Sequence, residues 1–151
     1  MANTAAICTS FKQELLQGIH AFGTTVVRAG TTADTFKAAL FLASASLGAA
    51  TTTYSATGEV SGTNYTAGGV SVTNGNAPAT SGTTAYWTPS ASFSWTTVTL
   101  STSFDAVLLY NSTQSNKAVA VFTFGAQTVT AGNFSLTMPT NDSSNALLRI
   151  S

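Results

Sequence analysis

The sequence predicts a single all-β domain, sandwich-like or jelly-roll-like, with one short amphipathic helix near its N-terminus. Three observations support this. Short apolar runs that suit strands recur along the chain, turn signals rich in Gly, Asn and Ser separate them at short spacing, and only 7% of the 151 residues are charged. Low charge together with many Thr, Val and Phe residues argues against disorder, which requires low hydrophobicity or high net charge. A chain of this length is expected to form one domain over residues 1–151.

The predicted centre of the fold is a β-hairpin within residues 104–124. Two apolar runs, residues 107–110 and 118–124, flank the polar segment 111–117. Each run is too short for a stable helix, and its residue types fit a pleated surface, whereas Asn and Ser between them favour a turn. Both faces of the second run are apolar, so we expect central strands that are covered on two sides.

The N-terminal part is predicted to hold an arm, residues 1–9, followed by a helix over residues 10–22. Ser10 and Gln13 match a capping box, and Gly23 suits the end of the helix. The apolar stripe of this helix comprises Phe11, Leu15, Ile19 and Phe22. Such a stripe requires one partner surface, which is either the protein's own sheet or a neighbouring subunit.

The sandwich is predicted to occupy residues 34–151. Its further strands are expected at residues 34–43, 84–88, 91–100, 127–130, 133–138 and 146–151. For residues 38–42 a helix is the alternative. Strict alternation places Phe93, Trp95, Thr97 and Thr99 on one face and Val98 and Leu100 on the other. Gly68 and Gly69 are predicted to form a hairpin turn, and residues 77–83 a loop.

The charge distribution favours protein partners. The net charge is zero, and the five basic residues are scattered along the chain: Lys12, Arg28, Lys37, Lys117 and Arg149. Because nucleic acids and anionic membranes bind clustered basic residues, this distribution argues against both as partners. A neutral, hydroxyl-rich surface gives little colloidal repulsion and suits broad contact within an assembly. We therefore expect a homo-oligomer with closed symmetry, with a trimer as the first choice.

No catalytic or metal-binding pattern is present in the sequence. His20 is the only histidine and Cys8 the only cysteine, and a helix would place them about 120° apart, which does not favour a Cys–His dyad. The expected alternative is a buried Cys8 thiol and a partly exposed His20 imidazole. Zinc requires three or four ligands, so neither a metal nor another cofactor is expected, and the protein is predicted not to be an enzyme.

Aromatic residues in or beside polar strands and turns can serve as core packing, as a protein interface or as a sugar-binding platform. All three alternatives remain open from the sequence. With the helix stripe included, the candidate interface comprises Phe11, Leu15, Ile19, Phe22, Tyr65, Trp87, Trp95 and Tyr110.

Four segments together resemble a family of small virion structural proteins of tailed bacteriophages. They read NTAAICTSFKQELLQGIHAF, TTTYSATGEVSGTNYTAGGVSV, AVLLYNSTQSNKAVAVFTFG and VTAGNFSLTMP, and the resemblance extends from Asn3 to the C-terminus. Its most specific part is EVSGTxYTAGG followed by the Tyr-Asn-Ser…Ser-Asn-Lys-Ala hairpin. One departure is that the connection over residues 23–32 is longer than in the family, which bears on where the helix docks.

The resemblance implies a non-enzymatic protein of the virion, made in the cytoplasm of the host bacterium and located on the capsid surface. Its expected partners are the major capsid protein or other virion proteins, and its expected role is that of a capsid decoration or cement protein. A neck or tail component is one alternative, and a receptor- or sugar-binding module of a head or tail fibre is the other. The chain is short and lacks the long repeats or heptads of a fibre shaft, which favours decoration.

Overall fold

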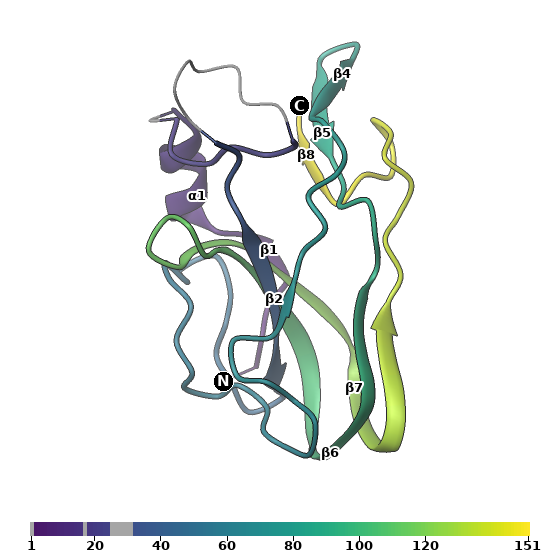
Figure 1. Cartoon of the computed structure of the whole chain (residues 1–151). Helices are drawn as coiled ribbons and strands as arrows, with labels where there is room; N and C mark the ends of the chain where they lie inside the picture. Colours follow the sequence, from purple (N-terminus) through teal and green to yellow (C-terminus); the bar gives the residue numbers. More distant parts are fainter. Residues whose placement is uncertain (1, 17, 25–31) are drawn as a thin grey trace.

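A computed structural model describes residues 2–16, 18–24 and 32–151. Within these residues, eight strands form two antiparallel sheets, and one helix, α1 (Thr9–Leu16), lies near the N-terminus (Figure 1). The strands are β1 (Ala6–Ile7), β2 (Phe36–Leu42), β3 (Val70–Ser71), β4 (Ala79–Ser81), β5 (Thr84–Trp87), β6 (Phe93–Asn111), β7 (Lys117–Leu136) and β8 (Leu148–Ile150). The larger sheet has the order β1-β7-β6-β2-β3 and the smaller sheet β4-β5-β8. The predicted all-β fold is confirmed, and the two sheets are consistent with a β-sandwich.

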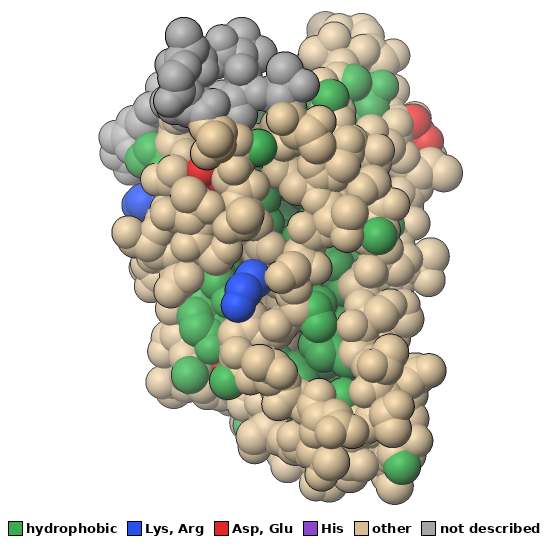
Figure 2. All heavy atoms as spheres, viewed as in Figure 1, with side chains coloured by type: hydrophobic (Ala, Val, Ile, Leu, Met, Phe, Trp, Pro, Cys, Tyr) green, Lys and Arg blue, Asp and Glu red, His purple; other side chains and the backbone are tan. Residues whose placement is uncertain are grey.

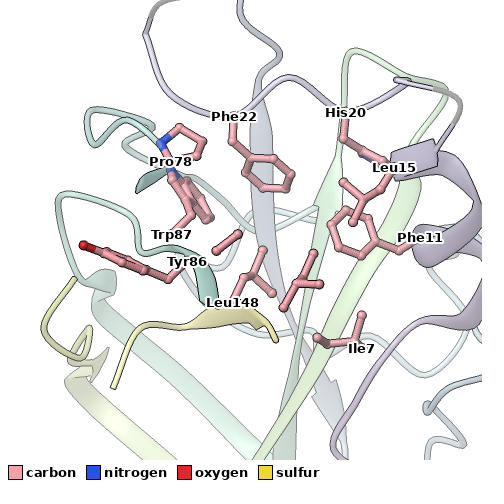
Figure 3. Close-up of a pocket in the computed structure, with 11 residues that line it drawn as sticks. Ile7, Phe11, Leu15, His20, Phe22, Pro78, Tyr86, Trp87 and Leu148 are labelled. Atoms are coloured by element: carbon pink, nitrogen blue, oxygen red, sulfur yellow. The ribbon is translucent and has the colours of Figure 1, made fainter. Parts of the chain in front are cut away.

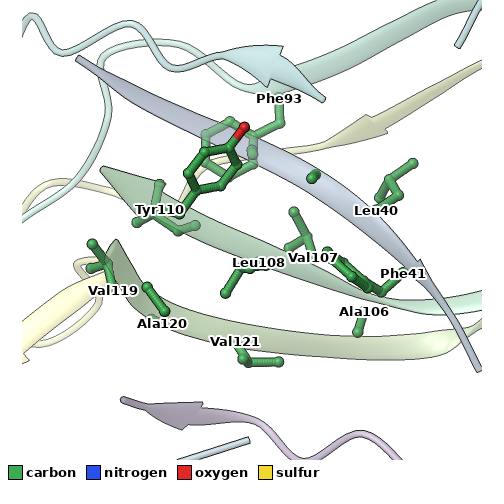
Figure 4. Packing of buried hydrophobic residues seen from close by; sticks show 14 of the residues in the cluster. Leu40, Phe41, Phe93, Ala106, Val107, Leu108, Tyr110, Val119, Ala120 and Val121 are labelled. Atoms are coloured by element: carbon green, nitrogen blue, oxygen red, sulfur yellow. The ribbon is translucent and has the colours of Figure 1, made fainter. Parts of the chain in front are cut away.

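The predicted central hairpin is confirmed as the pairing of β6 with β7, and β6 is the middle strand of the larger sheet. Residues 106–111 and 118–121 are buried throughout, as expected for strands covered on both faces (Figure 4). Val107 and its neighbour Leu40 on β2 share one face, whereas Ala106 and Phe41 share the other. The hairpin is much longer than predicted, because the runs expected as separate strands over 91–100 and 127–138 are continuous with it.

The β6–β7 ribbon folds back on itself. The rings of Phe104 and Phe134 lie 5.0 Å apart, although Phe104 is paired with Gln127, and residues 127 and 134 would be roughly 20 Å apart in a straight strand. Successive register shifts between Trp95 and Ala106 permit this bend, since bulges bend and twist a ribbon. Figure 1 shows both strands reversing at the bottom of the view, so that the two halves of one hairpin face each other.

The bulges also overturn the predicted faces of residues 93–100. Phe93, Trp95, Val98 and Leu100 are all buried, whereas Thr97 is exposed. Thr97 has a positive φ of 52°, and the extra residue at this bulge restores the inward direction at Val98. The N–H of Thr97 donates to Asn133 Oδ1 at 2.8 Å, and its carbonyl accepts from Asn64 Nδ2 at 2.9 Å.

The helix is shorter than predicted, since it ends at Leu16 and not at residue 22. Gly18 has a φ of 65°, its N–H donates to the Leu15 carbonyl at 3.0 Å, and the Ile19 N–H donates to the Glu14 carbonyl at 3.0 Å. These are the two bonds of a Schellman motif, so Gly18 and not Gly23 ends the helix. The predicted capping box is also absent, because the Ser10 hydroxyl lies inside the helix without a partner among the described residues.

The predicted N-terminal arm is a docked segment. Ala6 and Ile7 pair with Val121 and Ala120 of β7. The Asn3 side chain donates to Asp105 Oδ1 at 2.6 Å and accepts from the Leu47 N–H at 2.9 Å. These bonds tie the start of the chain to both the ribbon and the loop after β2.

Among the smaller expectations, the strand over residues 34–43 is confirmed and two others change. Residues 36–42 are a strand, so the helical alternative is wrong. Gly68 and Gly69 form a turn with positive φ angles, but no hairpin, because β3 pairs with β2. The predicted loop 77–83 contains β4, which pairs with β5. Most of the lengthened connection, residues 25–31, lies outside the described residues.

The bend predicts a stabilising substitution. Ala131 has a φ of 46°, a conformation that costs an L-residue about 1 kcal/mol but costs glycine little. We expect Ala131→Gly to raise the free energy of unfolding by about 1 kcal/mol in urea titrations. Ala126→Gly is the matched control in the same strand, and it should lower stability by about 0.5–1 kcal/mol. Equal losses in both variants would contradict the strained bulge.

Candidate interaction site

The eight candidate interface residues divide into two groups by burial. Phe11, Trp87, Trp95 and Tyr110 are buried, which favours the core alternative for them. Leu15, Ile19, Phe22 and Tyr65 are half-buried, and their role as interface residues stays a prediction. Four of the eight gather around one pocket, whereas Ile19, Tyr65, Trp95 and Tyr110 lie elsewhere.

The pocket is an apolar cavity of about 230 Å³ between the N-terminal segment and the small sheet (Figure 3). The residues that line it are Ile7, Phe11, Leu15, His20, Phe22, Pro78, Ala85, Tyr86, Trp87, Leu148 and Ile150. They come from β1, α1, the segment after the helix, the residue before β4, β5 and β8. The pocket therefore lies where the two sheets and the helix meet.

Phe22 is the aromatic residue that joins these elements. Its ring stacks on Phe36 of β2 with centroids 4.5 Å apart and lies 4.6 Å from the Trp87 ring of β5. Asn74 fixes the backbone beside it, because its side chain accepts from the Gly23 N–H at 2.7 Å and donates to the Gly23 carbonyl at 3.0 Å. Phe22 thus serves as part of the contact between the two sheets.

The pocket offers carbon surface and few polar atoms. Trp87 Nε1 donates to the Asn76 carbonyl at 2.9 Å, and both ring nitrogens of His20 are bound to other side chains. Figure 3 shows the Tyr86 hydroxyl directed away from the other lining residues. The cavity can therefore accommodate an apolar group, and it provides little to orient a polar one.

A buried polar cluster lies beside the pocket at the tip of the central hairpin. We name it the His20 cluster; it consists of Glu14, His20, Asp34, Asn111 and Lys117. Glu14 accepts from His20 Nε2 at 2.7 Å and from Lys117 Nζ at 2.6 Å. Asn111 Nδ2 lies 3.0 Å from His20 Nδ1 and 2.8 Å from Asp34 Oδ2. The expectation of a partly exposed imidazole is wrong, because His20 is buried.

The hydrogen bonds of Asn111 determine the tautomer of His20. Asn111 Oδ1 accepts from the N–H groups of Thr113 and Gln114, each at 3.1 Å, so its Nδ2 is the atom that faces the imidazole. A donor facing Nδ1 requires an unprotonated nitrogen there. The ring is therefore neutral, and it carries its proton on Nε2, which donates to Glu14.

The environment supports this protonation state. Burial lowers the pKa of His20 below its ordinary value, and the opposing effects of Glu14 and Asp34 do not offset it. Burial alone would raise the pKa of Glu14, but hydrogen bonds from Lys117 and His20 outweigh it and hold that pKa below its usual range. At neutral pH Glu14 is thus ionised, whereas the His20 imidazole is neutral.

Cys8 is a buried thiol, as expected. Its Sγ lies 3.9 Å from the Gly48 carbonyl oxygen, and burial raises the pKa of the thiol to about 11. His20 has both ring nitrogens engaged with Glu14 and Asn111, so the two residues do not form a dyad. No group of three or more potential metal ligands occurs in residues 2–16, 18–24 and 32–151.

Tyr65 and Tyr110 belong to a second polar network, on the face of β2 that carries Phe41. Glu59 accepts hydrogen bonds from the Tyr65 hydroxyl at 2.8 Å, from the Gly68 N–H at 2.8 Å and from the Tyr54 hydroxyl at 2.6 Å. Tyr110 donates to the Gly68 carbonyl at 2.8 Å, and burial raises its pKa to about 12, so the hydroxyl stays protonated. This network fixes the loop over residues 54–69 against the sheet.

Comparison of the chain with protein-family models, with curated proteins and with solved structures gave no match. Among the described helical residues, no stretch is long and apolar enough to cross a membrane.

Sequence reasoning missed the partners of His20. From the sequence, Lys117 is only one of five scattered basic residues, Asn111 only part of the turn segment 111–117, and Asp34 only the first residue of an expected strand. The one available signal was their position, because all three lie at the ends of apolar runs that became β2, β6 and β7.

Asn111 predicts a large loss of stability on truncation. It is fully buried, and Asn111→Ala removes the donor to both His20 and Asp34. We expect the free energy of unfolding to fall by about 2–4 kcal/mol, because two buried acceptors lose their partner. Asn141→Ala, at an exposed position, should change it by less than about 0.5 kcal/mol. Similar small effects in both variants would rule out a structural role for the cluster.

Proposed function

We propose that this protein is a virion structural protein of a tailed bacteriophage, a capsid decoration or cement protein that binds the outer capsid shell. It acts through protein contacts, without catalysis and without a cofactor. Its partners are the major capsid protein and further copies of itself, and we propose a trimer as the oligomer. The observation that carries this proposal is the resemblance to phage virion proteins, together with the positions that the resembling residues take in the fold.

One resembling segment, EVSGTNYTAGG, contains Glu59, Tyr65 and Gly68 of the Glu59 network. Glu59, Tyr65 and Gly68 are joined by hydrogen bonds, and a Cβ on Gly69 would clash with the Ala38 carbonyl. Few residue types can meet these requirements. The residues that resemble the family therefore lie at positions with specific structural requirements, which a similar overall composition alone would not reproduce.

The second resembling segment forms the tip of the central hairpin. Ser115 and Asn116 have φ values of 52° and 58°, and Lys117 binds Glu14 of the helix. Asn111 accepts hydrogen bonds within the loop and also contacts His20. This segment thus connects the hairpin to the N-terminal segment, which is itself part of the resemblance.

The surface supports broad protein contact. Figure 2 shows a face on which Lys, Arg, Asp and Glu side chains are few, and backbone and uncharged polar side chains cover most of the area, with apolar side chains between them. Within the described residues, Ile150 is the one large hydrophobic side chain that is clearly exposed, at 52%. Hydroxyl groups cost less to remove from water than charges do, so such a surface suits an extended contact with a shell.

Copy number in the virion tests the proposal most directly. Quantitative mass spectrometry of purified particles should find the protein on the order of hundreds of copies, because a capsid repeats its binding sites by symmetry. About a dozen copies would instead indicate a neck ring or a fibre and would refute the decoration role.

Particles that lack the protein provide the second arm of this experiment. They should lose resistance to heat or osmotic shock and still adsorb to cells. Failure of adsorption with an equally robust shell would favour the fibre alternative.

A further inference from the structure

We propose that the His20 cluster is an acid-sensitive latch, in which protonation of His20 at Nδ1 releases α1 and residues 18–24 from the tip of the β6–β7 hairpin. The cluster lies where separate parts of the chain meet. Glu14 and His20 belong to the N-terminal segment, Asn111 and Lys117 end and begin the two long strands, and Asp34 precedes β2. This inference does not depend on the proposed role in the virion.

A proton on Nδ1 would find no acceptor. Asn111 Nδ2, a donor, lies 3.0 Å away. The amide cannot simply turn over, because Oδ1 accepts from the N–H groups of Thr113 and Gln114 in the hairpin loop. A turned amide would also place its oxygen against Asp34 Oδ2, which already accepts from the Ala21 N–H at 2.9 Å. Protonation therefore breaks the contact of His20 with Asn111, and the Glu14–Lys117 pair is left as the polar contact of α1 with the hairpin.

The charged groups that face the ring act in both directions. Glu14 from α1 and Asp34 from the segment before β2 favour the protonated form, whereas Lys117 from β7 opposes it. The ring is also buried, with the Phe11 ring 4.8 Å from it, and burial opposes the charge most strongly. The balance lowers the pKa of His20 in the folded protein.

The sign of the pH effect follows from this direction. Below the ordinary pKa of a histidine, about 6.5, the released segment binds a proton that the latched segment does not. The latch is therefore fully closed above this pH and weakens as the pH falls below it. The opposite trend would require a raised pKa in the closed state.

Release would affect a defined part of the molecule. Residues 3–8 keep their own bonds to Asp105, Leu47 and β7. The freed part would be α1 with residues 18–24, which carries Phe11 and Phe22 and so forms one wall of the apolar pocket. The contacts of Phe22 with Phe36 and Trp87 and the bonds of Asn74 to Gly23 do not involve His20, so acid is expected to loosen this wall of the pocket, while the central sheet stays paired.

Hydrogen exchange with mass spectrometry tests the latch on the full chain. Opening rates of peptides that cover residues 9–24 are compared at pH 7.5 and 5.5, after correction for the intrinsic exchange rate. We expect opening to increase by up to about tenfold at the lower pH, the limit for one histidine across this range. Peptides that cover β2 should not respond.

The control variant is His20→Gln, which does not titrate and can still donate and accept a hydrogen bond. Since His20 is the only histidine, this variant should lose the pH response. The same response in both proteins, or none in the wild type, would overturn the proposal.

If the variant does not fold, the imidazole ¹⁵N shifts of the wild type decide. A proton on Nε2 alone at neutral pH is expected, and a proton on Nδ1 would overturn the latch.

Discussion

The pairing of β6 with β7 positions every other part of this protein. β6 is the middle strand of the larger sheet, and β7 holds β1 along its other edge. Because the ribbon bends between Trp95 and Ala106, its far half covers the face that carries Val107 and Phe122. A cavity between the two halves is lined by these residues together with Phe93 and Leu136. The opposite face is covered by Tyr54, which stacks on Tyr110 at 4.6 Å. One hairpin thereby supplies the core on which the loops, the small sheet and the N-terminal segment are placed.

α1 and residues 18–24 are fixed to this core by two different kinds of contact. Phe22 provides the apolar contact, through Phe36 and Trp87. The His20 cluster provides the polar contact, and it is the more specific of the two, because a buried charge or amide that loses its partner is costly whereas apolar surfaces tolerate shifts. On the face that Figure 2 shows, charged side chains are few. This combination, a rigid β core with a surface that is inexpensive to desolvate, is what the proposed capsid role requires.

The central hairpin could be predicted from the sequence because its signal is local: two apolar runs of strand-forming residues flank a polar turn. The bend could not be predicted, because Thr97 and Ala131 adopt the left-handed conformation, which a sequence indicates only where the residue is a glycine. Gly18 indicated the end of the helix, but Gly23 was equally suitable as a C-cap, so the sequence did not distinguish the two positions. The His20 cluster joins residues as far as 103 positions apart, so no pattern within one segment could reveal it. The aromatic candidates were ambiguous for a related reason, since burial depends on what the rest of the chain places over them.

The folded-back ribbon is the central claim, and the contact between the rings of Phe104 and Phe134 tests it most directly. These rings lie 5.0 Å apart, and both also contact Phe124, at 6.0 Å and 5.4 Å. A nuclear Overhauser experiment on phenylalanine-labelled protein, with Phe134→Leu used to assign the signals, should show cross-peaks between Phe104 and Phe134. A straight ribbon would separate the two rings by roughly 20 Å, so the absence of these cross-peaks in a folded protein would contradict the account.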